Sequence, residues 1–117
     1  MKLIVAGGRK FNDYKTLSDK LDYLLSKRTK EEVVFICGMA LGADSLGLRY
    51  AKDNGYSWEE YPASWDLHGR SAGHIRNSQM ADVGTHLVAF WDGISKGTKN
   101  MIDIANKKGL VVGIVYY

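Results

Sequence analysis

The chain has 117 residues, of which 45% are hydrophobic and 25% are charged, and its formal net charge is +3. This is the size and composition of a single globular domain, so we expect one domain over residues 1–117. A single cysteine, Cys37, excludes an internal disulfide and a cysteine-based zinc site. Lysine and arginine are spread along the chain rather than clustered, which argues against a dedicated nucleic-acid-binding protein.

The first half of the chain reads as strand, helix, strand, helix, strand. Apolar residues recur at helical spacing over residues 17–25 and again over 44–52, and residues 26–32 form a polar linker. The third apolar run is the most amphipathic, so we expect it near an edge of the sheet. The strands expected in this half are Leu3–Ala6, Val33–Cys37 and Tyr56–Tyr61.

The second half continues the alternation after an irregular segment at 63–71. A helix is expected over Ala72–Asp82, a strand at Thr85–Trp91, a helix from Lys96 and a last strand at Leu110–Val115. Alternating strands and helices indicate a parallel sheet with right-handed crossovers. We therefore predict a three-layer α/β/α fold with a five-stranded, mainly parallel sheet.

Membrane and secretion signals are not expected. No apolar stretch approaches the ~20 residues of a membrane helix, and the chain opens on a strand pattern rather than a signal peptide. We expect a cytoplasmic protein that does not contact a membrane, with Cys37 as a small buried residue at the end of its strand.

Four glycine-rich segments fall where we expect strands to end. Carboxyl ends of parallel strands meet at one edge of the sheet, and ligands bind there. Glycine lets the backbone approach a ligand, and a helix that starts beside it directs free N–H groups toward an anion. A phosphate-bearing small molecule is therefore expected; without one, these would be tight turns between strand and helix. The segments are Gly7-Gly8-Arg9, Gly38–Asp44, Ala72–Asn77 and Gly93–Thr98.

Several familiar motifs do not fit. No Gly-Lys-Ser/Thr follows the glycines, so there is no Walker A loop, and the first turn lacks the third glycine of a dinucleotide fingerprint. There is no nucleophile elbow. His68 and His74 have no acidic or cysteine partners at ligand spacing, and His86 starts a strand, so neither a metal nor a cofactor is expected.

Charged and aromatic side chains near this edge have two interpretations each. Arg9 and Arg76 either bind phosphate through their planar guanidinium groups or form ordinary salt bridges. Asp44 bonds a ribose or caps its helix. Trp65 and Trp91 stack on a base or pack at the rim.

Taken together, the motifs resemble the SLOG superfamily, and within it the small bacterial and phage proteins related to YspA. The resemblance covers almost the whole chain and implies a Rossmann-like fold, a nucleotide-like ligand and a homo-oligomer. The residues that it assigns to ligand binding, together with those from the reasoning above, are Gly7, Gly8, Arg9, Gly38, Ala40, Gly42, Asp44, Trp65, Arg76, Asn77, Gly97 and Thr98.

Some members of this superfamily are phosphoribohydrolases, which cleave the N-glycosidic bond of nucleoside monophosphates with an arginine and a glutamate. This chain keeps Arg76 and the Gly97-Thr98 pair, but Met101 stands at the glutamate position. Methionine has no charge and no transferable proton. The sequence therefore favours a protein that senses or sequesters a nucleotide. The alternatives are a nucleotide N-glycosidase using Arg76 with Asp44 or Asp66, and nucleic-acid binding like that of the DNA-processing protein A family.

Overall fold

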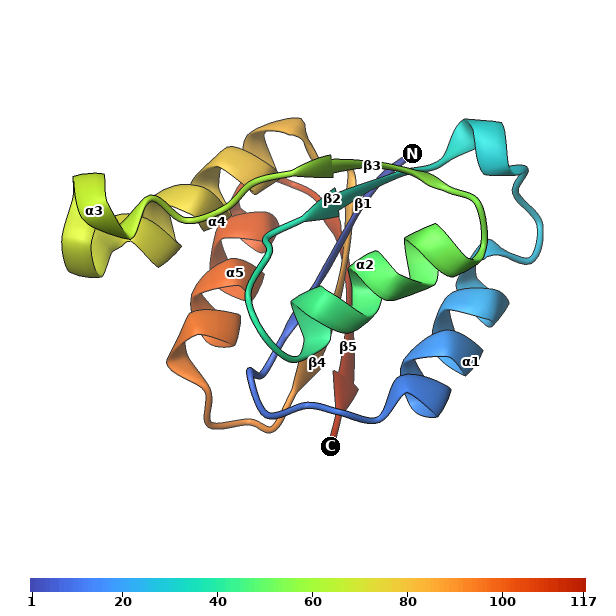
Figure 1. The fold of residues 1–117 in the computed structure, drawn as a ribbon, viewed down its shortest axis with the longest axis horizontal. Coiled ribbons are helices and arrows are strands. Elements are labelled where there is room, and N and C mark those ends of the chain that lie inside the picture. The colour runs from blue at the N-terminus through green and yellow to red at the C-terminus, as the bar shows by residue number, and fades with distance from the viewer.

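The computed structural model describes residues 1–117 and contains one five-stranded sheet covered by helices on both faces (Figure 1). The strands are β1 (Lys2–Gly7), β2 (Val34–Cys37), β3 (Ser57–Glu60), β4 (His86–Trp91) and β5 (Val111–Tyr116). The helices are α1 (Tyr14–Leu25), α2 (Ala43–Asp53), α3 (Trp65–His68), α4 (Ala72–Val83) and α5 (Lys96–Lys107), with 3-10 turns η1 (Lys30–Glu32) and η2 (Gly69–Ser71). None of these helices has the length and apolar character required to cross a membrane.

The strand order is β3-β2-β1-β4-β5, and every neighbouring pair is parallel. This confirms the predicted three-layer fold and the place of the third strand at an edge. The chain winds outward in one direction from β1 to β3 and then in the other from β4 to β5. The order thus reverses between β1 and β4, and a crevice is expected where these two strands end.

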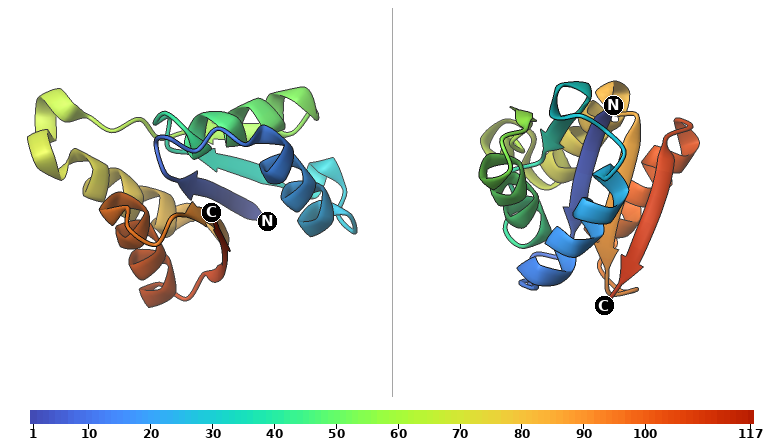
Figure 2. Two further views of the ribbon diagram at one scale, coloured as in Figure 1. Left: turned by 90° about the horizontal axis from the view of Figure 1, so that it is seen from below. Right: turned by 90° about the vertical axis from the view of Figure 1, so that its right-hand side faces the viewer.

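Alternate residues of the central strands point to opposite faces of the sheet. Figure 2 shows the two layers of helices that cover these faces. In β1, Leu3 and Val5 pack on the side of α1 and α2, whereas Ile4 and Ala6 pack on the side of α4 and α5. Burial on both faces explains why these strands read as continuous apolar runs. Cys37 is 3% exposed, which confirms that it is a small buried residue.

Two segments differ from the expectation. The segment 63–71, expected to be irregular, contains α3 and η2, neither of which has a buried residue. Without a buried face there is no apolar periodicity to reveal them. The helix expected over Ala72–Asp82 is confirmed as α4. The further prediction that Ala72–Asn77 is a glycine-rich turn directly after a strand was wrong, because these residues form the first turns of α4 and follow η2. In Figure 1, α3 projects beyond the end of the sheet, at the side of α4.

Candidate functional site

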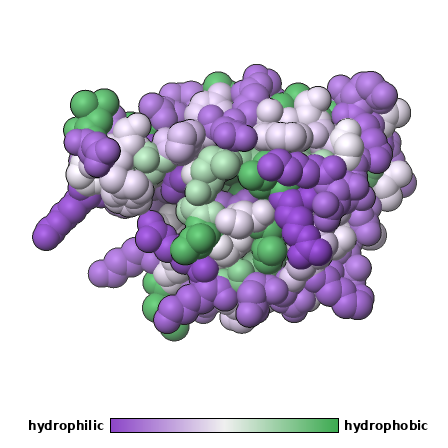
Figure 3. All heavy atoms as spheres, in the orientation of Figure 1, coloured by the Kyte–Doolittle hydropathy of each residue, from purple (hydrophilic) through white to green (hydrophobic).

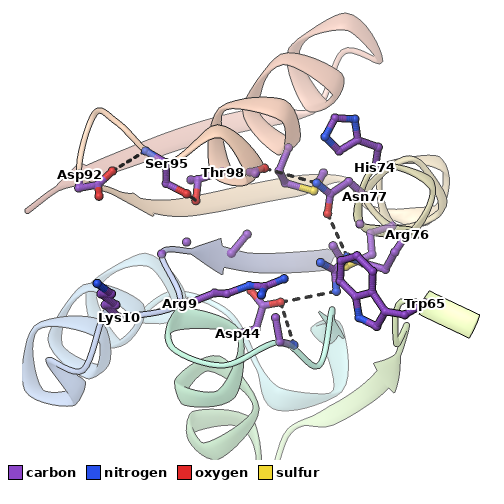
Figure 4. A pocket seen from close by; sticks show the side chains of 18 of the residues that line it. Arg9, Lys10, Asp44, Trp65, His74, Arg76, Asn77, Asp92, Ser95 and Thr98 are labelled. Carbon is purple, nitrogen blue, oxygen red and sulfur yellow. Dashed lines mark hydrogen bonds and ion pairs between the residues drawn. The ribbon is translucent and has the colours of Figure 1, made fainter. Parts of the chain in front are cut away.

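A cavity of about 530 Å³ opens at the edge of the sheet where β1 and β4 end. The loop after β1 and the start of α5 form part of its wall, and α4 forms another part (Figure 4). The volume lies within the roughly 300–1,000 Å³ of small-molecule sites. Ten of the twelve predicted ligand-binding residues line it: Gly7, Gly8, Arg9, Ala40, Asp44, Trp65, Arg76, Asn77, Gly97 and Thr98. The sheet topology therefore brings together segments that are far apart in the chain.

The two remaining predicted residues lie elsewhere. Gly38 lines a second, smaller hollow next to the cavity. Gly42 lines neither, because it packs underneath the loop after β1: a Cβ there would lie 2.2 Å from the carbonyl oxygen of Gly8.

Arg76 and Asp44 form a buried pair that joins α4 to the start of α2. Arg76 Nη1 lies 3.8 Å from Asp44 Oδ2 and also donates to the carbonyl oxygen of Gly38. The backbone N–H of Ala40 donates to the same carboxylate oxygen over 3.3 Å. Arg76 Nε donates to Asn77 Oδ1 over 3.0 Å. Two of the three guanidinium nitrogens thus donate hydrogen bonds inside the protein. Asp44 holds its own loop rather than capping the helix.

Burial dominates the electrostatics of this pair. Asp44 is 5% exposed, and its desolvation raises its pKa to about 6, although Arg76 and the Ala40 N–H both favour the charged form. Burial also lowers the pKa of Arg76. A carboxyl group with such a pKa, in a cavity, is the kind of group that can exchange protons near neutral pH.

Asn77 connects α4 to α5. Its Nδ2 donates to Asn100 Oδ1 over 2.9 Å and to the carbonyl oxygen of Gly97 over 3.4 Å. These bonds fix the start of α5 against the cavity wall, so Asn77 positions the residues that follow β4.

The N-terminus of α5 faces the cavity without a side-chain cap. Ser95 occupies the N-cap but makes no capping bond, and the Thr98 hydroxyl, buried, donates to Ser95 Oγ over 3.3 Å. A Cβ added to Gly97 would meet nothing within 4 Å. The first N–H groups of a helix have no acceptor within it, and the helix dipole adds positive potential. This end of α5 is therefore suited to an anion.

The loop before α5 is shaped by Asp92. Its Oδ1 accepts hydrogen bonds from the N–H groups of Ile94 and Ser95 over 2.9 and 2.8 Å. These two bonds lower the pKa of Asp92, so it is ionised and engaged in its own turn.

The lining carries more positive than negative charge. Arg9, Lys10 and Arg70 form no ion pair, whereas the carboxylates of the lining, Asp44 and Asp92, are both engaged. The Arg9 guanidinium lies 5.8 Å from the centre of the Trp65 ring, which is half-exposed. Figure 4 shows Arg9 and Asp44 on one side of the cavity and Ser95 and Thr98 on the other. An anion between them would meet cations and helix N–H groups together.

Close packing explains the glycines after β1 and before α2. A Cβ at Gly8 would lie 2.0 Å from Tyr117 Oη, and Gly42 has a φ of +76° besides its contact with Gly8. We expected these glycines to let the backbone approach a ligand. The structure instead shows close packing at both positions: a side chain fills the space beside Gly8, and backbone fills the space beside Gly42. Gly97, in contrast, leaves open space at the cavity.

Other expected residues do not reach the cavity. Trp91 packs at the rim, with its ring 5.8 Å from that of Tyr116 and its Nε1 donating to the carbonyl oxygen of Ser95 over 3.0 Å. Asp66 lies on the exposed helix α3 and does not line the cavity.

Met101 is 1% exposed and lines the cavity, so no carboxylate stands at that position. Of the two carboxylates considered for catalysis, Asp44 alone lines the cavity.

The lining side chains that the sequence analysis missed include Lys10, Arg70, His74 (considered only as a metal ligand) and Tyr117. Lys10 follows Arg9 after the first strand, so its position carried a usable signal. Arg70 lies in the segment without periodicity. Tyr117 reaches the site through its contact with Phe11, 4.8 Å between ring centres, which local sequence does not reveal. No three His, Cys, Asp or Glu side chains are grouped to hold a metal ion.

Comparison with known proteins adds a family to this geometry. The family of proteins described as "YspA, cpYpsA-related SLOG family" has a sequence model that matches residues 1–68 of this chain. The chain belongs to this family. The match confirms the SLOG resemblance and covers β1 to α3, including Arg9, Asp44 and Trp65. This chain is also 32% identical over 117 residues to the "Gene 61 protein" of Mycobacterium phage D29. The alignment covers 95% of this chain and 93% of the phage protein. No solved structure matches.

Proposed function

We propose that this SLOG protein binds a nucleotide or a nucleotide-derived molecule in the cavity and acts as a sensor or sequestering module. One observation carries the proposal: the uncapped start of α5 opens into a cavity that also holds Arg9 and Lys10 without acidic partners. Both features favour a phosphate group. Family membership supports a nucleotide-related ligand.

The parts of the ligand are assigned by chemistry. The N–H groups of Gly97 and Thr98 receive the phosphate, and Arg9 and Lys10 neutralise its charge. The exposed ring of Trp65 offers a surface on which a base stacks. Met101 places no acid or base near the sugar, which is consistent with a ligand that is bound and released intact.

The test is a panel of mono-, di- and cyclic nucleotides, read by thermal shift. A ligand that binds only the folded state raises the melting temperature. Arg9→Ala is expected to weaken the binding of the best nucleotide by about tenfold, the loss of one charge-assisted contact. Arg28→Ala is the matched control, since Arg28 is exposed, forms no ion pair and lines no part of the cavity. A panel without any shift, or equal binding by Arg9→Ala and wild type, would refute the proposal.

A second function is favoured by Asp44 alone. Its buried carboxyl group, with a pKa raised to about 6, lines the cavity beside Arg76, which suits a general acid or base in an N-glycosidase. Chromatography of the same samples would then reveal free base, and Asp44→Asn would abolish its release. Recovery of an intact nucleotide after prolonged incubation would exclude this second function.

A further inference from the structure

We infer that the ligand has two ring-bearing parts, as a dinucleotide does, with one part in the cavity and the other in an adjoining hollow that exposes apolar side chains. This inference rests on the proposed function and narrows the class of nucleotide. The hollow has a volume of about 360 Å³ and lies beyond Arg9 and Trp65, at the ends of β2 and β3. It differs from the crevice between β1 and β4, where the phosphate is expected.

The hollow is open to solvent, and its lining combines exposed apolar side chains with the two arginines Arg9 and Arg76. Its side chains include Met39, Leu41, Pro62, Ala63 and Trp65. Leu41 is 73% exposed and Trp65 is 50% exposed, so large apolar surfaces face water there. In the space-filling view, apolar residues gather near the middle of the face, beside the projecting α3 lobe (Figure 3). These exposed apolar side chains suit a planar ring, and the arginine beside them suits a phosphate attached to that ring.

Met39 supplies an independent observation. It has a φ of +64°, the only non-glycine residue of the chain with a positive φ. This conformation is disfavoured for a side chain such as methionine, and strained backbone of this kind concentrates at binding sites. Here the strained residue displays an apolar side chain at the hollow instead of burying it.

The two spaces are neighbours that share part of their lining, which points to one occupant for both. Arg9, Ala40, Trp65 and Arg76 line both the cavity and the hollow. A molecule that spans them passes Arg9, whose unpaired charge would neutralise a bridging phosphate, and presents a ring to either side of Trp65. A mononucleotide fills the cavity alone. A dinucleotide uses both spaces.

The experiment compares each mononucleotide that binds with the dinucleotide that joins two copies of it through a pyrophosphate, for example AMP with diadenosine diphosphate. Isothermal titration calorimetry measures both affinities in wild type, in Leu41→Ser and in Met39→Gly. We expect the dinucleotide to bind at least tenfold more tightly, and Leu41→Ser to reduce its affinity about tenfold through lost apolar contact. Mononucleotide affinity should not change. Met39→Gly should weaken the dinucleotide in the same way without loss of stability, since glycine adopts the positive φ freely.

Leu24→Ser, a substitution of an exposed leucine on α1 that lines neither space, is the control. Equal affinities of mononucleotide and dinucleotide, or unchanged dinucleotide affinity in both variants, would overturn the inference and leave the proposed function intact. If no nucleotide bound at all, the proposed function would fail and the inference with it.

Discussion

Arg76 donates hydrogen bonds to the β2–α2 loop and to Asn77, and it pairs with Asp44, so its first role is to hold the cavity together. Removing it would leave the carboxylate of Asp44 buried without a counter-charge. We expect Arg76→Ala to lower the free energy of unfolding by about 3 kcal/mol. Urea denaturation measures this. Wild-type stability in Arg76→Ala would show that the pair does not support the fold.

Asp44 makes a prediction about pH. Its pKa is raised from 3.8 to about 6 in the folded protein, so the folded state retains a proton that the unfolded chain has lost. Stability contributed by Asp44 therefore falls as pH rises from about 4 to about 6, by an amount on the order of 2–3 kcal/mol. Asp44→Asn should remove this decline from a series of denaturation curves. A decline of the same size in the variant would assign it to other groups.

At the scale of residues, the sequence predicted the members of the site better than their roles. Asp44 was expected to bond a ribose or cap its helix, and Arg76 to meet phosphate or form an ordinary salt bridge. The salt bridge is the one observed, and it joins the two residues inside the wall. Gly8 was expected to admit a ligand, but it admits Tyr117 from the other end of the chain. Such contacts depend on the folded sheet, and no local pattern specifies them.

The start of α5 is the element on which the proposed function depends. Gly97 leaves open space toward the cavity, whereas Gly42 has a positive φ and no room for a Cβ. Gly97→Ala should keep or raise stability, by up to about 1 kcal/mol from helix propensity, and should weaken nucleotide binding by narrowing the anion site. Gly42→Ala should destabilise the protein strongly. Thermal melting and titration of both variants separate the two roles, and unchanged binding by Gly97→Ala would contradict the assignment of the phosphate.

At the scale of elements, burial decided what could be predicted. The strands buried on both faces, such as β1 and β4, appear in the sequence as continuous apolar runs. Helices α1 and α5 each bury one face, so their spacing is visible. Helix α3 buries nothing and has no spacing to recognise. It nevertheless contributes Trp65 to the site, and this residue was found as a tryptophan in a loop rather than from its helix.

The whole molecule has two sheet edges of different character. Edge strand β3 carries Glu59 and Glu60. The opposite edge strand, β5, has no charged side chain and exposes Val111, Ile114 and Tyr116. Charges protect an edge from pairing, and their absence favours it. We therefore propose that two copies of the chain associate through β5. Light scattering after size exclusion should give a dimer, and Ile114→Lys a monomer; a monomeric wild-type protein would contradict this.

The position of the ligand phosphate tests the central claim most directly. A crystal structure with the nucleotide that gives the largest thermal shift would reveal it. The account predicts a phosphate within hydrogen-bonding distance of the backbone N–H groups of Gly97 and Thr98, with Arg9 or Lys10 beside it. A nucleotide bound elsewhere, or one whose phosphate lies away from the start of α5, would contradict the account.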